Sequence, residues 1–305
     1  MLKLKKFLNE NKVAIIIFSI LLFIVMYSCF KYIRNDIKVK EGREERTTYC
    51  KSDEVKESEK LSCEQYIEAI TNEEIKTEFY SMFGDILVFD IHYLNFIAFL
   101  VVIIPSLYCV SNYLYNRVIT NCLTRQSYKS FIKDFIRKAY KYYFILPIII
   151  GLLILICLFY SEMDPSYSLS NNYSIWRSNL IFKPVLFVFL YLINITIYSL
   201  SYINISLIVL RKQQNIIKAI ILSVLVFVGI EVFLEIVVNG LIFGLVFKSE
   251  VGNIFNIMNL LIFNINYGVS KLLIFTISFF LLTFILVLIL YKNKEKLIID
   301  CEKNN

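Results

Sequence analysis

Six stretches of apolar residues, each long enough to cross a bilayer as a helix, divide the chain. A helix needs about 20 apolar residues to span a hydrocarbon core of about 30 Å. The stretches cover residues 13–30, 86–110, 143–160, 180–210, 216–238 and 270–291. We therefore predict an all-α integral membrane protein with six transmembrane helices, which form a single transmembrane domain over residues 1–305.

A seventh apolar stretch, residues 240–263, is interrupted by Lys248, Glu250 and several asparagines. This pattern predicts a re-entrant or interfacial hairpin on the outer side, between the fifth and sixth helices, with seven spans as the alternative. The first stretch has the basic start and apolar core of a signal peptide. Because no small-x-small cleavage site follows it, we expect an uncleaved first helix.

Lys and Arg gather in alternate loops along the chain. Short loops rich in these residues stay on the cytoplasmic side of a membrane. Residues 1–12 are therefore expected to be a cytoplasmic interfacial arm, and both termini are expected to be cytoplasmic. Residues 34–85 are then an extracellular loop or small cap. The formal net charge of +7 is explained by this topology, so it gives no reason to expect a nucleic-acid partner.

Composition restricts the class of protein and the kinds of site that the chain can hold. The chain is 58% hydrophobic with a mean hydropathy of +0.64, which excludes an ordinary soluble domain. The only histidine is His92, so metal sites that need two histidines are excluded, and we expect no metal. Cys50 and Cys63 are the two cysteines in the expected outer loop. They are candidates for a disulfide bridge, with two free thiols as the alternative.

The segment 111–142 contains the clearest amphipathic pattern. Apolar side chains recur from Tyr128 onward at helical spacing, and basic side chains fill the other face. The basic residues are Lys129, Lys133, Arg137, Lys138 and Lys141. Such a helix either lies flat on an anionic leaflet or docks onto a partner. A polar turn that ends in Thr124 and Arg125 favours docking.

The order of these parts, with the run Thr124-Arg125-Gln-Ser-Tyr128-Lys129-Ser-Phe131-Ile132, resembles the six-helix membrane subunit of type-2 ABC exporters. The resemblance covers most of the chain and lies in topology more than in sequence. It implies that residues 111–142 are a cytoplasmic coupling region. The contacts with the ATPase are then expected from Thr124, Arg125, Tyr128, Lys129, Lys133 and Arg137.

The same resemblance implies an ABC ATPase subunit, a second permease subunit (identical or different) and membrane lipid as partners. The chain has no Gly-x-x-x-x-Gly-Lys-Ser/Thr sequence, the loop that cradles ATP phosphates. ATP is therefore expected on the partner chain, with no cofactor bound here. We expect this chain not to be an enzyme, and the absence of a His-Glu-x-x-His sequence agrees.

Polar residues inside the spans suggest where a substrate pathway runs. Asn194, Tyr198 and Ser201 share one face of the fourth span, and Glu231 and Glu235 lie one helical turn apart in the fifth. Acidic residues inside a span are costly and indicate function. The alternatives are hydrogen bonds between helices for the first three residues, and an early end of the fifth span for the two glutamates.

The sequence thus predicts the permease subunit of an ABC exporter in the inner or plasma membrane of a bacterium. The high Ile, Lys, Asn and Phe content, typical of AT-rich bacterial genomes, supports the bacterial source. The alternatives are a secondary transporter or channel, and a membrane-bound immunity or sensor protein.

Overall fold

The computed structural model describes residues 11–52, 55–56, 59–71, 77–114, 118–165, 176–213, 215–248, 261–293, 295 and 297–298. All regular elements in these ranges are helices. Five helical segments are long and apolar enough to cross a membrane: Lys12–Lys51, Tyr128–Tyr160, Pro184–Lys212, Ile216–Val246 and Val269–Leu290. The chain therefore has the helices of a multi-pass membrane protein, as the hydropathy pattern predicts.

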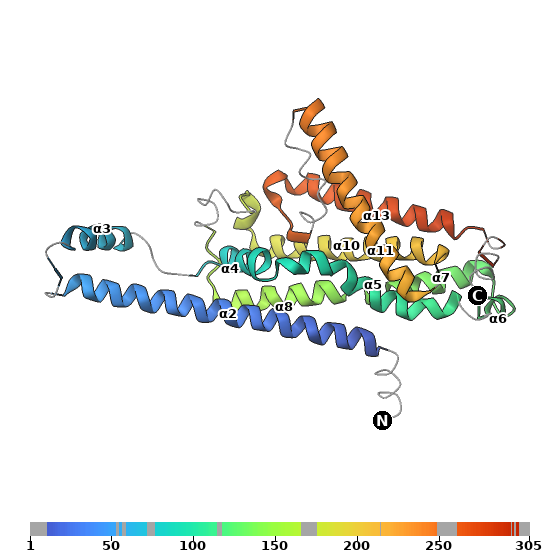
Figure 1. Cartoon of the computed structure of the whole chain (residues 1–305), viewed down its shortest axis with the longest axis horizontal. Helices are drawn as coiled ribbons and strands as arrows, with labels where there is room; N and C mark the ends of the chain where they lie inside the picture. Colours follow the sequence, from blue (N-terminus) through green and yellow to red (C-terminus); the bar gives the residue numbers. More distant parts are fainter. Residues whose placement is uncertain are drawn as a thin grey trace, which may run out of the picture.

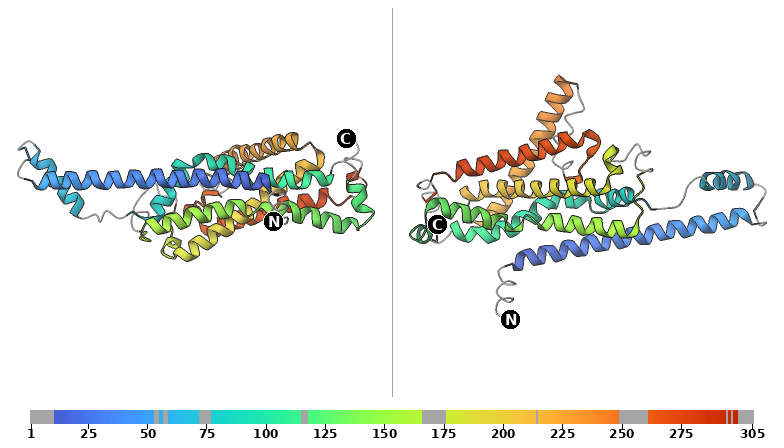
Figure 2. Two further views of the ribbon diagram at one scale, coloured as in Figure 1. Left: turned by 90° about the horizontal axis from the view of Figure 1, so that it is seen from below. Right: turned by 180° about the vertical axis from the view of Figure 1, so that it is seen from behind.

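The bundle is built around α10 (Pro184–Lys212), which packs against α13 (Val269–Leu290), α11 (Ile216–Val232), α5 (His92–Leu114) and α8 (Ile145–Tyr160). The long helix α2 lies along the outside against α8 and α5 (Figures 1 and 2). The shorter elements are α3 (Lys60–Thr71), α4 (Phe79–Asp85), η1 (Ile86–Asp90), α6 (Val118–Leu123), α7 (Tyr128–Ala139), η2 (Tyr140–Tyr142), η3 (Asn179–Phe182), η4 (Phe233–Val246) and η6 (Ile265–Tyr267).

The predicted second span, residues 86–110, is divided in the structure. Helix α4 and the π-helical turn η1 come first, the chain bends at Ile91, and α5 starts at His92. The apolar part of α5 is the segment Ile97–Ser111, which is shorter than the five long helices. The count of six spans therefore stays a prediction.

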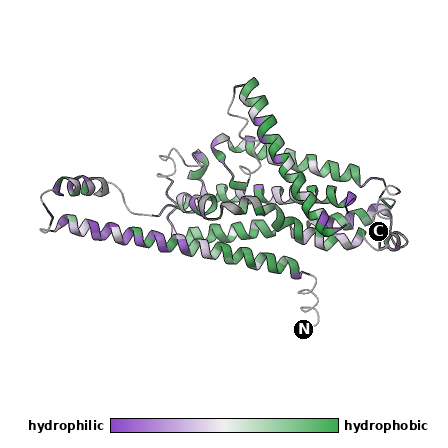
Figure 3. Cartoon of the chain, in the orientation of Figure 1, coloured by the Kyte–Doolittle hydropathy of each residue, from purple (hydrophilic) through white to green (hydrophobic). Residues whose placement is uncertain are grey.

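Helix α2 (Lys12–Lys51) is 40 residues long and runs well past its apolar part. Figure 3 shows it changing from hydrophobic to hydrophilic along its length. Its polar half projects from the bundle, and α3 lies beside its far end (Figure 1). The first part of the predicted outer loop is thus a direct extension of the first span. We call residues 31–71 the hairpin, and the end of the bundle from which it projects the hairpin end.

A disulfide bridge between Cys50 and Cys63 joins the two arms of the hairpin. Polar and aromatic contacts reinforce it, since the Arg46 guanidinium lies 4.4 Å from the centre of the Tyr66 ring. The Tyr49 hydroxyl also donates to Glu59 Oε2 at 2.8 Å. The bridge therefore fixes α3 against α2 where there is little apolar core.

We predict that removing this bridge frees α3 while leaving the bundle folded. The bridged cysteines are 13 residues apart, and closing a loop of that length stabilises a fold by up to about 3 kcal/mol in the chain-entropy model. The double variant Cys50→Ser/Cys63→Ser should make the hairpin sensitive to protease. Maleimide labelling of intact cells is the direct check on the bridge: full labelling of both thiols without reductant would show that it is absent.

Asp36 connects the base of the hairpin to the bundle. Its carboxylate accepts hydrogen bonds from Thr77 Oγ1 at 2.8 Å and from the Tyr160 hydroxyl at 2.9 Å. Lys40 Nζ lies 2.9 Å from the same oxygen. The chain just before α4 and the end of α8 are thereby fixed to α2.

An aromatic cluster fills the hairpin end of the bundle. Its fully buried members are Tyr80, Phe83, Trp176, Phe187, Tyr191 and Phe263. The Trp176 ring stacks on Phe83 with 5.1 Å between ring centres, and its indole N–H donates to the Phe263 carbonyl at 3.1 Å. The cluster thus joins α4, the segment before η3, α10 and the chain before η6.

The fifth span is longer than predicted. Helix α11 continues into the π-helix η4, which ends at Val246 rather than near residue 238. All residues of η4 are described, none of its side chains is buried, and it leans away from the other helices (Figure 1). Residues 249–260 of the predicted outer hairpin lie outside the described residues, so that hairpin stays a prediction.

Candidate functional site

The predicted amphipathic helix is present as α7, with η2 leading directly from it toward α8. Its N-cap is Ser127, whose hydroxyl accepts from the Ser130 backbone N–H at 3.3 Å. The apolar side of the helix is buried through Phe131, Phe135 and Ala139. The helix therefore packs into the bundle through this side and leaves its polar side outward. We call residues 124–142 the elbow.

The elbow is hydrogen-bonded to several helices. The Tyr128 hydroxyl donates to the Tyr291 carbonyl, just past α13, at 2.5 Å. The Tyr140 hydroxyl donates to Asn204 Oδ1 of α10 at 2.5 Å, and the Tyr142 hydroxyl donates to Asn11 Oδ1, next to α2, at 2.9 Å.

A further bond joins the elbow to α5, where Ser106 Oγ donates to the Ala139 carbonyl at 2.7 Å. The elbow therefore touches the start of α2, the middle of α5, α10 and the end of α13. A displacement of the elbow would act on all of these helices at once.

The exposed cations of the elbow are Arg125, Lys129, Lys133, Arg137 and Lys141. Thr124 is also exposed, and its hydroxyl donates to the Asn121 carbonyl at 2.8 Å, which shapes the turn before Arg125. Arg137 is 3.1 Å from Asp134 of the same helix. The exposed face is thus mainly basic and includes one carboxylate.

Two lysines of the predicted basic face have other roles. Lys138 is half-buried, and its ammonium contacts the Tyr113 hydroxyl and ring. Lys141 Nζ donates to Asn11 Oδ1 at 2.8 Å. The stem of Lys138 is partly buried while its charged end reaches a polar partner, and Lys141 reaches its partner from an exposed position. Both lysines thereby hold the elbow to the bundle.

The polar residues predicted on the fourth span lie inside the bundle. Asn194 is fully buried, and its Oδ1 accepts from Thr276 Oγ1 of α13 at 2.7 Å. Ser201 is buried and donates to the Ile197 carbonyl of its own helix at 3.0 Å. Tyr198 packs on Tyr202, with 4.3 Å between ring centres. All three side chains are therefore buried, and of the contacts just described only the bond between Asn194 and Thr276 joins two helices.

A second pair between the same helices lies nearer the elbow. Asn204 Nδ2 donates to Thr283 Oγ1 at 3.1 Å, while Asn204 Oδ1 accepts from Tyr140. Sequence reasoning did not select Thr276, Thr283 or Tyr140 as functional. The usable signal was the spacing, since Thr276 and Thr283 are seven residues apart and so share one face of α13.

The two glutamates of the fifth span differ in environment. Glu231 is half-buried and close enough to Tyr198 and Tyr202 of α10 to interact electrostatically with both. Glu235 is exposed, and its Oε1 accepts from Asn239 Nδ2 at 3.2 Å within η4. Glu231 is therefore the more buried of the two glutamates, whereas the side chain of Glu235 is exposed.

No group of three or more His, Cys, Asp or Glu side chains suited to a metal ion occurs among the residues that the structure describes. The chain matches no protein-family model, and no curated protein or solved structure matches it either. The elbow and the polar interior are therefore the features of the chain that bear on its function.

Proposed function

We propose that the chain is the membrane-spanning permease subunit of an ABC exporter, driven by an ATPase on a separate chain. The observation that carries the proposal is the elbow. It presents the exposed cations Arg125, Lys129, Lys133 and Arg137 on one side, and on the other it is bonded to α2, α5, α10 and α13. A docked subunit that pushes on the basic side would thus move several helices together.

The rest of the proposed topology follows from this contact. Helix α5 completes the proposed count of six spans. In chain order it is the second span, between α2 and the α7–α8 segment. The start of α2 and the end of α13 both bond to the elbow, so both lie on the side of the ATPase, which we propose is the cytoplasm. Two such permease chains, identical or different, would pair to form the pathway in the bacterial cell membrane.

The substrate pathway is proposed to involve the interior layer that Asn194, Tyr198, Ser201 and Glu231 share, with Glu235 on the outer side. In the conformation described here this layer is closed by hydrogen bonds between α10 and α13. Hydrogen bonds between membrane helices average only about 0.6 kcal/mol. These two bonds alone would therefore not keep the layer closed when the elbow moves.

Copurification is the decisive experiment. A tagged chain isolated from its native membrane should bring down a protein with a Gly-x-x-x-x-Gly-Lys-Ser/Thr sequence in near-equal amount. If no such protein copurifies, the proposal is overturned, and a secondary transporter, a channel or an immunity protein is favoured.

We predict that Arg125→Glu reduces the bound ATPase by about tenfold or more, because like charges across an interface repel, while the chain still inserts and folds. Arg125 is exposed, so the reversed charge should repel an acidic docking surface without disturbing the core. The matched control is Lys218→Glu, which reverses an exposed cation at the start of α11, outside the elbow. Equal ATPase recovery from both variants would contradict the docking role of Arg125.

A further inference from the structure

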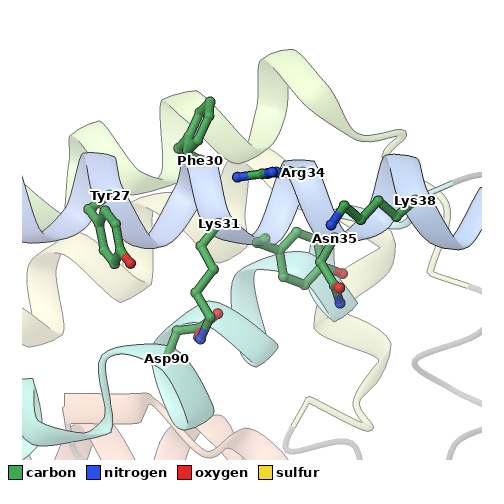
Figure 4. Close-up of a pocket in the computed structure, with 8 residues that line it drawn as sticks. Tyr27, Phe30, Lys31, Arg34, Asn35, Lys38 and Asp90 are labelled. Atoms are coloured by element: carbon green, nitrogen blue, oxygen red, sulfur yellow. The ribbon is translucent and has the colours of Figure 1, made fainter.

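A groove lies on α2 where the helix changes from apolar to charged. Its volume is about 490 Å³, and seven residues of α2 between Tyr27 and Lys38 line it together with Asp90 of η1. That size is in the range of small-molecule sites. Figure 4 shows Lys31 reaching toward Asp90 while Arg34 and Lys38 follow along the helix.

The groove has a net positive charge. Lys31 Nζ is 2.6 Å from Asp90 Oδ1, so this pair is neutral overall. Arg34 and Lys38 are exposed and add two positive charges. Among the described residues that line the groove, Asp90 is the one acidic side chain. An anionic ligand is therefore favoured over a neutral or cationic one.

The depth of the groove follows from the length of the apolar part of α2. No charged residue occurs between Lys12 and Lys31. Those 18 uncharged residues rise about 27 Å at 1.5 Å per residue, close to the thickness of a hydrocarbon core of about 30 Å. Lys31 and Arg34 thus lie at the level of lipid headgroups, on the leaflet where α2 leaves the membrane.

An exposed apolar track leads to the groove along the same side of α2. Phe23 is 72% exposed and Phe30 is 64% exposed. With Tyr27, they recur at steps of four and three residues, and Arg34 and Lys38 continue the series. Residues at this spacing share one helix face. Acyl chains can therefore lie on the aromatic track while a phosphate reaches the cations beyond it.

We propose that the groove binds the phosphate of an anionic phospholipid, with the acyl chains along Phe23, Tyr27 and Phe30. Arg34 supplies a planar group of N–H donors that suits phosphate oxygens, and Lys38 adds a second charge. This inference requires only that α2 crosses a bilayer, and it does not depend on the exporter function proposed above.

The test measures how much phosphatidylglycerol stays bound to the purified full-length chain and to the double variant Arg34→Gln/Lys38→Gln. Each protein is released from nanodiscs of phosphatidylcholine with phosphatidylglycerol and examined by native mass spectrometry. Each cation removed near a membrane surface should weaken binding about fivefold, so the double variant should lose about 25-fold. The matched control, Lys51→Gln/Lys56→Gln, removes the same charge near the hairpin tip and should bind as the unchanged chain does.

Both groove substitutions are at exposed positions, so the thermal unfolding temperature should stay the same and exclude misfolding as the cause. Equal phosphatidylglycerol binding by the groove variant and the control would overturn the proposal. A large excess of inorganic phosphate separates a lipid site from a site for free anions. If phosphatidylglycerol stays bound in the presence of this phosphate, the result supports a lipid site. Full displacement of phosphatidylglycerol by phosphate would overturn the lipid assignment.

Discussion

Replacing Trp176 with alanine is expected to lower the free energy of unfolding by about 3 to 5 kcal/mol, the usual cost of deleting a buried large aromatic side chain. The indole is 1% exposed and lies in the aromatic cluster, stacked on Phe83 and in edge contact with Tyr80 and Phe187. Truncation leaves a cavity that these rings cannot close without shifting. The loss of close packing has a cost at the end of a membrane bundle as it does in a soluble core.

The control for this prediction is Trp176→Phe. It keeps an aromatic ring in the cluster and removes the hydrogen bond to the Phe263 carbonyl, which should cost about 1 kcal/mol plus the effect of a smaller ring. Trp176 is the only tryptophan, so intrinsic fluorescence cannot compare the variants. Circular dichroism during a denaturant titration in detergent measures the free energy of unfolding of both variants. Equal destabilisation by the two variants would show that the hydrogen bond, not packing, dominates.

The second large effect is expected at Tyr291. This residue is 1% exposed, its ring packs on Phe135 of α7, and its hydroxyl donates to the Leu207 carbonyl of α10 at 2.9 Å. Tyr291→Ala should therefore destabilise the chain by about 3 to 4 kcal/mol. It should also loosen the elbow from α13, because the Tyr128 bond to the Tyr291 carbonyl depends on this packing.

Tyr291→Phe is the matched control, since it removes one hydroxyl and leaves the ring in place. Its expected cost is about 1 kcal/mol or less. Hydrogen exchange of α7 amides separates the two effects. Faster exchange in Tyr291→Ala than in Tyr291→Phe is the expected result, and equal exchange in the two variants would show that Tyr291 does not hold the elbow.

Hydropathy predicted five of its six spans as long apolar helices, because long apolar runs have few alternatives to crossing the bilayer as helices. It predicted their ends less well. The chain after Phe30 is charged, but Lys, Arg and Glu dominate it and all favour helix, so α2 continues to Lys51. Similarly, Gly240 and Gly244 did not end the fifth helix, which continues to Val246. Hydropathy indicates where a helix leaves the membrane and not where the helix stops.

The candidate site was predictable where it depends on periodicity within one helix. The burial of Phe131 and Phe135 follows directly from the amphipathic pattern. The partners across helices were not predictable, because the pairing of Asn194 with Thr276 depends on how α10 and α13 are aligned. That alignment comes from packing along the whole interface, which a single sequence does not show.

The unbroken length of α2 has a mechanical consequence. At 1.5 Å per residue its 40 residues make a rod of about 60 Å, of which about half lies beyond the apolar part. The rod acts as a lever arm whose fulcrum is the contact with α8 and the Asp36 bonds. From Asp36 to Lys51 the outer arm is about 23 Å, so a tilt of about 10° at the fulcrum would move the bridged tip sideways by about 4 Å. The inner arm, from Lys12 to Asp36, is about 36 Å and therefore the longer of the two. A tilt of α2 inside the bundle thus reaches the tip as a smaller displacement, and a force applied at the tip is passed back to the membrane helices through the same rigid rod.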